Sequence, residues 1–254
     1  MSISRNSILD TTVSAANLFD SHCHLQFPEF DLDRAEVIAR AQKAGLSKIV
    51  LIGIDQESIE KGTELAQSDP SFFELAIGHH PYHADQTDDD FITYLQKQID
   101  QHPFITAIGE TGLDYFRCQL PKVTQINSLT KHAKLAKLNN LNLILHTRET
   151  DDCLEDTLAV LAEQGTTKAI FHCFAGSLAS AQKIWQLGYK TSFGGNITYK
   201  NNSHLLEIAR LCPPELLLLE TDSPYLTPAP NRQERNEPAN IPTIYQHLTQ
   251  EGGV

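Results

Sequence analysis

Short apolar runs recur along the chain at intervals that suit strands separated by helices. Several runs are apolar at consecutive positions, which is typical of strands covered on both faces, as in a parallel sheet. On this basis we predict strands at residues 18–24, 48–54, 72–80, 106–112, 142–148, 168–174, 189–195 and 216–223.

The segments between these runs have helical periodicity. Val37 and Ala41 share one helical face, as do Leu154, Leu158 and Leu161. Glycines that suit the left-handed end of a helix follow several of these segments and precede the next strand, namely Gly45, Gly165 and Gly188.

Strands alternating with helices in this number predict a (β/α)8 TIM barrel, although a doubly wound open sheet has a similar alternation. The polar residues favour the barrel. They follow many different strands, whereas an open sheet gathers its site at one switch point, often with a glycine-rich phosphate loop. Neither GxGxxG nor GxxxxGK occurs in the sequence.

The length of 254 residues suits one barrel domain over residues 19–254. Residues 1–18 lack a basic region and a long apolar run, so we expect a polar, loosely attached extension and no signal peptide. No apolar stretch is long enough to span a membrane, and we expect no membrane partner. Five scattered cysteines without a CxxC pair indicate reduced thiols and a cytoplasmic location.

The formal net charge of −12 disfavours broad, non-specific adhesion to nucleic acid, because such binding needs many Lys and Arg contacts to phosphate. It does not exclude an enzyme that acts on nucleic acid, since bound metal ions supply local positive charge.

His22 and His24 stand two residues apart at the end of the first apolar run. Side chains at this spacing in a strand point to the same face, so both imidazoles can reach one metal ion. Alone, the pair fits equally well two histidines bonded to backbone. The metal interpretation gains weight because histidine or carboxylate also follows four later apolar runs, at Glu110, His146, His172 and Asp222.

Six segments, in order, resemble the TatD family of metal-dependent hydrolases and deoxyribonucleases, whose fold is an amidohydrolase-type barrel. They are FDSHCHLQF (19–27), IGHHPYHA (77–84), IGETGLDYF (108–116), LILHTRE (143–149), FHCFAGS (171–177) and ETDSPYLTPAPNRQERNEP (220–238). Compared with that family, the chain has the N-terminal extension and is short at the C-terminus, where members usually carry a further helix.

The resemblance implies two divalent metal ions. It assigns the first ion to His22, His24 and Asp222, the second to His146 and His172, and both to Glu110. Asp222 would also orient or deprotonate the attacking water. Imidazole and carboxylate ligands suit Zn or Mn, and the resemblance also allows Mg. Asp20 and Glu220, each two residues before a ligand, are expected to support the histidines or the metals.

Residues beyond the ligands are candidates for substrate binding. His80 and His83 suit contacts to phosphate, or else they stabilise a proline-containing turn. Arg148 suits a phosphate clamp, and its alternative is an ion pair with Glu149 or Asp151. Tyr115 stacks on a base or packs at the barrel rim, two interpretations that the sequence leaves open.

The leading hypothesis is a deoxyribonuclease with 3′-to-5′ exonuclease character that acts on single-stranded DNA ends, working as a monomer. The alternative is a hydrolase of small amides, lactones or phosphoesters on the same barrel. A third hypothesis is a non-catalytic metal-binding protein. The retention of Glu110 and Asp222 disfavours the third.

Overall fold

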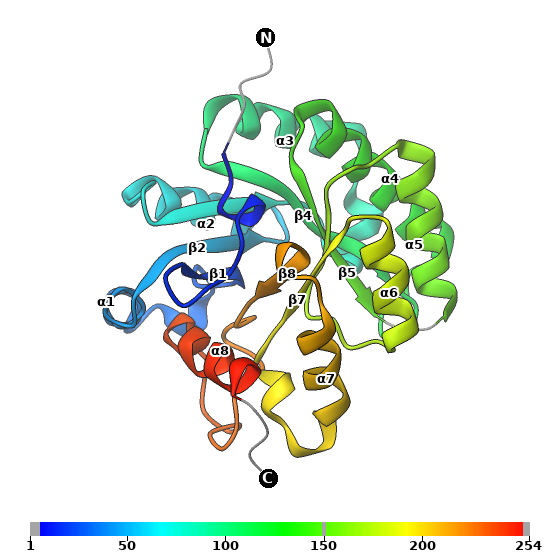
Figure 1. The fold of residues 1–254 in the computed structure, drawn as a ribbon. Coiled ribbons are helices and arrows are strands. Elements are labelled where there is room, and N and C mark those ends of the chain that lie inside the picture. The colour runs from blue at the N-terminus through cyan, green and yellow to red at the C-terminus, as the bar shows by residue number, and fades with distance from the viewer. Residues whose placement is uncertain (1–5, 149–150, 251–254) are drawn as a thin grey trace.

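Eight parallel strands follow one another in sequence order around a barrel, and helices cover its outer surface (Figure 1). The structure is a computed structural model that describes residues 6–148 and 151–250. The strands are β1 (Leu18–Cys23), β2 (Leu46–Gly53), β3 (Phe73–Ile77), β4 (Ile105–Asp114), β5 (Asn142–Arg148), β6 (Ala169–Phe171), β7 (Lys190–Phe193) and β8 (Leu217–Leu219). The predicted TIM barrel is confirmed.

The helices alternate with the strands. They are α1 (Arg34–Lys43), α2 (Gln56–Ser68), α3 (Asp89–Gln101), α4 (Lys122–Asn139), α5 (Asp151–Gln164), α6 (Leu178–Gln186), α7 (Ser203–Leu211) and α8 (Ile241–Thr249). Short 3-10 helices also occur, and two of them matter below, η1 (Ile8–Asp10) and η3 (Pro81–Gln86).

Local sequence signals begin and end these helices. The carboxylates of Asp55 and Asp88 each accept a hydrogen bond from a backbone N–H in the first turn of the following helix. Gly45, Gly165 and Gly188 have φ angles of 86°, 61° and 75°, which confirms the predicted left-handed helix ends.

Strand β3 and the last three strands are shorter than we predicted. After β6 and β8 the chain leaves the extended conformation, because Cys173 and Asp222 have φ angles of 46° and 54°. The residues that we expected at the strand ends therefore lie in turns just beyond them.

Strands β1 and β8 close the barrel at their carboxyl ends. The backbone N–H of Asp222 donates to the carbonyl oxygen of His22 over 2.9 Å, and that of His24 donates to the carbonyl oxygen of Ser223 over 2.9 Å. These bonds hold the ends of the first and last strands side by side.

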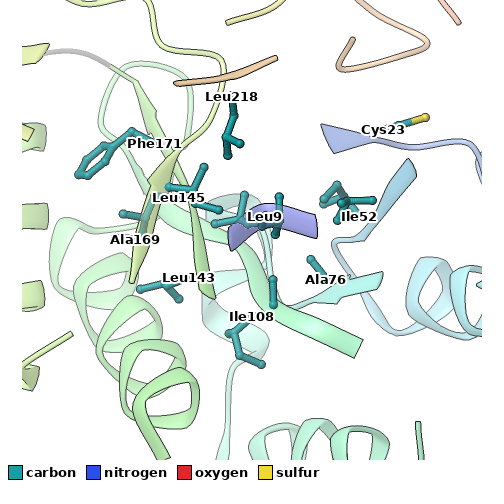
Figure 2. Packing of buried hydrophobic residues seen from close by; sticks show 14 of the residues in the cluster. Leu9, Cys23, Ile52, Ala76, Ile108, Leu143, Leu145, Ala169, Phe171 and Leu218 are labelled. Atoms are coloured by element: carbon teal, nitrogen blue, oxygen red, sulfur yellow. The ribbon is translucent and has the colours of Figure 1, made fainter. Parts of the chain in front are cut away.

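The expectation of a loose N-terminal extension is wrong for residues 7–13. Leu9 is fully buried, and Figure 2 shows it among core side chains such as Ile52 and Leu145. Ser7 Oγ and the backbone N–H of Ile8 donate to the buried carboxylate of Glu74 over 2.7 and 2.8 Å. The segment is held because its apolar residue fills the barrel core and its polar groups satisfy buried ones.

This N-terminal segment (residues 7–13) lies at the end of the barrel where the strands begin. Lys190, the first residue of β7, donates through Nζ to the carbonyl oxygen of Leu9 over 2.6 Å. Asn142, the first residue of β5, lies 3.3 Å from Asp10 through its amide nitrogen. The opposite end, where the strands stop, is left open for a site.

The other sequence expectations concern location and thiols. Among the described residues, no helix combines the length and the apolar character that a membrane span requires. All five cysteines are free thiols.

Candidate metal centre

The six predicted ligands converge at the carboxyl ends of the strands. Each comes from a strand end or the turn after it, and each side chain is buried or nearly so. They are His22 in β1, His24 just after β1, Glu110 in β4, His146 in β5, His172 after β6 and Asp222 after β8.

Glu110 lies at the centre of this group. Its Oε2 atom is 3.3 Å from His22 Nε2 and 3.9 Å from His24 Nε2. Its Oε1 atom is 2.8 Å from His146 Nδ1 and 2.9 Å from His172 Nε2. The two carboxylate oxygens therefore face two separate pairs of imidazoles.

Asp222 completes the half of the site that contains the first pair. Its Oδ1 atom lies 3.7 Å from His22 Nε2 and 3.5 Å from His24 Nε2, and the side chain is partly exposed. Together with Oε2 of Glu110, these atoms surround one small space. Asp222 is thus a ligand candidate that also reaches the open mouth, as does His146, whose side chain is 21% exposed.

Two glycines let strand β4 approach β5 closely enough to place Glu110. A Cβ atom on Gly109 would lie 2.4 Å from the carbonyl oxygen of Ile144, and one on Gly112 would lie 2.0 Å from that of His146. Both glycines also have φ angles, 133° and 143°, that L side chains rarely adopt. Glycine is therefore required on either side of Glu110.

The imidazoles in the site stabilise the ionised forms of its two carboxylates, Glu110 and Asp222. Burial raises the pKa of Glu110, but the neighbouring imidazoles, His172 foremost, outweigh it and hold that pKa well below its usual range. Burial likewise opposes ionisation of Asp222, yet contacts with His24 and His22 lower its pKa. Both carboxylates are therefore anionic at neutral pH and attract a cation.

The pKa of the His172 imidazole is shifted upward, opposite to the shifts of the two carboxylates. Burial lowers its pKa, but the carboxylates of Glu110 and Glu220 outweigh burial and hold the pKa well above its ordinary value. A divalent ion that binds at His172 Nε2 must therefore displace a proton.

The donor set fits divalent metal ions. Ligands around a tetrahedral zinc ion, with bonds of 2.0–2.2 Å, lie about 3.3–3.6 Å apart. The nitrogens of His22 and His24 are 3.3 Å apart, and those of His146 and His172 are 3.5 Å apart. The structure also brings together three-residue groups whose donor atoms all lie within 4.8 Å, and Glu110 belongs to two of them.

Hydrogen-bond partners behind the histidine rings fix which ring nitrogen carries the proton and which presents a lone pair to the site. His24 Nδ1 lies 3.1 Å from the carbonyl oxygen of Ile52, which only accepts hydrogen bonds, so Nδ1 carries the proton and Nε2 presents a lone pair. His172 Nδ1 faces Glu220 Oε1 at 3.4 Å. Glu220 thus lies behind the His172 ring, where the predicted supporting role would place it.

Asp20 supports the site in a different way. It accepts hydrogen bonds from the backbone N–H groups of His22 and Thr221 over 3.2 and 2.9 Å. Burial raises the pKa of Asp20 to about 8, although its hydrogen bonds with Thr221 work against this. Asp20 ties the end of β1 to the segment after β8 and does not contact a histidine ring.

Asp114 is a site residue that sequence reasoning missed. Its Oδ2 atom lies 3.4 Å from His146 Nε2, on the side of the ring that faces away from Glu110. Its Oδ1 atom accepts the backbone N–H groups of Phe116 and Arg117 over 3.0 and 2.7 Å. The available signal was its even spacing from Glu110, which places both side chains on one face of β4.

Among the predicted substrate-binding residues, His80 lies closest to the cluster. Its Nε2 atom is 3.6 Å from Glu110 Oε1, and its ring centre is 4.5 Å from that of His146. Its Nδ1 atom accepts the backbone N–H of Tyr82 over 3.3 Å. Burial lowers the pKa of His80 to about 3, although the charge of Glu110 opposes this, so the ring is neutral and carries its proton on Nε2, toward the site.

Arg148 lies at the end of β5 and has its guanidinium carbon 5.6 Å above the ring centre of Phe116. Within the described part of the chain, no carboxylate lies within ion-pair distance of it. The alternative partner Glu149, and the side chain of Asp151, lie outside the described residues.

The structure does not bring the other two predicted contacts into the cluster. Tyr115 donates through its hydroxyl to Asp156 over 2.8 Å, and Lys122 Nζ lies 4.2 Å from its ring centre, which favours the packing interpretation. His83 accepts a long hydrogen bond from Gln86 within η3 and, among the described residues, has no bond to the metal ligands.

Residues 19–254 match the sequence model of a protein family described as TatD related DNase. YabD of Bacillus subtilis, an uncharacterized metal-dependent hydrolase, is 37% identical over 236 residues, which cover 92% of this chain and 90% of YabD. TatD of Mycobacterium tuberculosis, also described as an uncharacterized metal-dependent hydrolase, is 33% identical over 92% of this chain and 89% of its own.

Among solved structures, that of YjjV, a TatD homologue from Escherichia coli, superposes with a TM-score of 0.83 at 31% sequence identity. The match covers 91% of this chain and 88% of YjjV.

Proposed function

The chain belongs to the family of TatD-related DNases, a family of metal-dependent hydrolases, and on that premise we propose that it hydrolyses phosphodiester bonds in DNA with two divalent ions. We propose further that it removes nucleotides from the 3′ ends of single strands. The observation that carries the two-ion proposal is the position of Glu110, whose two oxygens face different imidazole pairs.

In this proposal the two halves of the site share Glu110 as a bridging ligand. His22, His24 and Asp222 would hold one ion, and His146 and His172 would hold the other. Divalent ions there would supply an activated water and neutralise charge on the phosphodiester. Zn or Mn suits the imidazole-rich donor set, and the identity of the ion is part of the test.

The chain's own side chains supply the remaining steps. Asp222 is anionic and reaches the mouth, so it is placed to orient the attacking water and accept its proton. His80 directs a neutral N–H into the site and can donate to a phosphate oxygen. Arg148, which has no carboxylate partner among the described residues, can bind the phosphate through its guanidinium fork.

The test uses single-stranded DNA labelled at its 5′ end, incubated with chelator, Mg, Mn or Zn. We expect metal-dependent shortening from the 3′ end, and we expect Glu110→Gln to slow it about a thousandfold, since a metal ion stabilises the transition state by several kcal/mol. Glu155→Gln is the matched control, because Glu155 is an exposed carboxylate on α5 that pairs with Lys183.

Two results would contradict the proposal. One is equal activity of the native protein and Glu110→Gln. The other is hydrolysis of a small phosphodiester such as methyl p-nitrophenyl phosphate with no cleavage of any DNA, which would support a small-molecule hydrolase instead.

A further inference from the structure

Two aromatic side chains stand exposed in neighbouring loops at the mouth of the barrel. Phe116, just after β4, is 67% exposed, and Tyr82, in η3 after β3, is 47% exposed. The two loops are in contact, since Cys118 Sγ donates to the carbonyl oxygen of Pro81 over 3.3 Å. Both rings therefore border the same side of the opening.

Both aromatic residues contact side chains of the half of the site that contains His146. The Tyr82 ring centre lies 4.5 Å from that of His80, whose Nε2 atom faces Glu110. The Phe116 backbone is fixed by Asp114, the same carboxylate that faces His146. The position of each ring relative to the reacting phosphate is thus set by a residue of the site itself.

Tyr225, after β8, is 51% exposed and also borders the site, with its ring centre 6.4 Å from that of His24. The exposed leucines have a different setting. Leu138 on α4 and Leu211 on α7 lie on the outer helices, and isolated exposed leucines of this kind are common on protein surfaces. Phe116 differs from them because it lies beside the active-site carboxylate Asp114 and beneath the guanidinium of Arg148.

Tyr115, the residue from which we expected stacking, has its hydroxyl bonded to Asp156 and a lysine over its ring. Phe116 has no hydroxyl, and its side chain is 67% exposed although the Arg148 guanidinium lies 5.6 Å from its ring centre. A base that stacks on Phe116 would leave its phosphate near Arg148, so the aromatic surface and the positive charge are matched to one nucleotide.

We infer that Phe116 and Tyr82 form a base-stacking platform that selects strands with unpaired bases at the reacting end. The inference rests on the proposed function and names the side chains that would give it a preference for single strands. Paired bases in a duplex are stacked on each other, so they cannot offer their faces to these rings without first melting. The platform therefore favours single-stranded ends over blunt duplex ends and over strands that lack bases.

The test compares two single strands of equal length labelled at the 5′ end, an oligothymidylate and the same strand whose last nucleotides at the 3′ end are abasic. For the native, metal-loaded protein we expect kcat/KM to be about five- to 150-fold higher on the strand with bases, the range expected for stacking of one base on an aromatic ring. Phe116→Ala and Tyr82→Ala should each reduce this ratio, and Phe116→Tyr should retain it.

Leu138→Ala is the matched control, because it removes an exposed apolar side chain far from the mouth and should leave the ratio unchanged. Cleavage of both strands at the same rate by the native protein would overturn the platform while the proposed nuclease stands. So would a ratio that neither Phe116→Ala nor Tyr82→Ala changes. Failure to cleave either strand with any metal would overturn the proposed function, and the platform with it.

Discussion

The tautomer and basicity of the histidines in the site depend on the group that faces the ring nitrogen directed away from the site. At His146 that group is Asp114, at His172 it is Glu220, and at His24 it is a backbone carbonyl. A carboxylate behind an imidazole fixes its tautomer and makes the ligating nitrogen more basic. The second half of the site therefore has anionic support for both of its imidazoles.

Replacing Asp114 with asparagine tests this support. Its amide oxygen would still accept the backbone N–H groups of Phe116 and Arg117, so the amide NH2 would face the N–H of His146 and repel it. We expect the affinity for a divalent ion to fall roughly 10- to 100-fold, as measured by isothermal titration of metal-free protein. Asp156→Asn is the control, since Asp156 bonds to Tyr115 outside the site. Unchanged affinity in Asp114→Asn would refute the role.

His132, again a single residue, predicts how the stability of the protein depends on pH. It is fully buried, its Nε2 accepts the backbone N–H of His79 over 3.0 Å, and its Nδ1 donates to the carbonyl oxygen of Ser128 over 2.8 Å. Burial lowers its pKa from 6.5 to about 4, although the bond to Ser128 opposes this. Below pH 6.5 the unfolded chain binds a proton that the folded protein refuses, so stability falls with pH until about pH 4.

Between pH 7.5 and 5.5 this single group should lower the free energy of unfolding by about 1.3 kcal/mol. His132→Gln keeps a donor and an acceptor but does not titrate, so its loss of stability over that range should be smaller by the same amount. Urea unfolding at both pH values measures the difference. An identical loss in both proteins would show that His132 is protonated in the fold.

At the scale of elements, the N-terminal segment and strand β4 show how the two ends of the barrel are built. The segment closes the end where strands begin, by placing Leu9 in the core and by bonding Ser7 to Glu74. Strand β4 builds the opposite end, where Gly109 and Gly112 permit close contact with β5. Because the site lies at the far end from the segment, changes in the segment should affect stability before they affect metal binding.

Leu9→Ala is the corresponding experiment. Removing a fully buried leucine leaves a cavity and should reduce the free energy of unfolding by about 2–5 kcal/mol, while the affinity for metal in the folded protein is unchanged. Leu32→Ala, at a fully exposed leucine, should change stability by no more than about 0.5 kcal/mol. If the two variants unfold at the same urea concentration, the segment does not stabilise the barrel.

At the scale of the whole molecule, the site connects strands from around the barrel. Its ligands come from β1, β4, β5 and the turns after β6 and β8, so an ion that binds them links the first strand to the last. A ligand that binds the folded protein and not the unfolded chain raises the stability of the whole fold.

We therefore expect chelation to lower the melting temperature. A metal at a hundred times its Kd adds about 2.7 kcal/mol, which for a chain of this length corresponds to roughly 5–11 °C. Scanning calorimetry with chelator and with Zn, Mn or Mg measures the shift and ranks the metals. His172→Ala should reduce the shift, and equal melting temperatures with metal and with chelator would contradict a bound ion in the native protein.

The hydrophobic pattern by itself determined the number of the strands, and glycine positions determined the helix ends at Gly45 and Gly188. These features depend on local periodicity and on backbone preferences, which neighbouring residues in the chain specify. The candidate ligands were also available from the sequence, because histidine or carboxylate side chains followed one strand after another.

Only the tertiary structure decided which side chains meet. Leu9 looked like part of a polar extension, and its burial depends on the width of the barrel that the distant strands form. Tyr115 and Phe116 are adjacent aromatics. Tyr115 is the one held within the protein, because Asp156 on α5 lies where it can accept a hydrogen bond from the Tyr115 hydroxyl. Such contacts join residues far apart in the chain, so they depend on the closed geometry of the whole barrel and leave no local pattern.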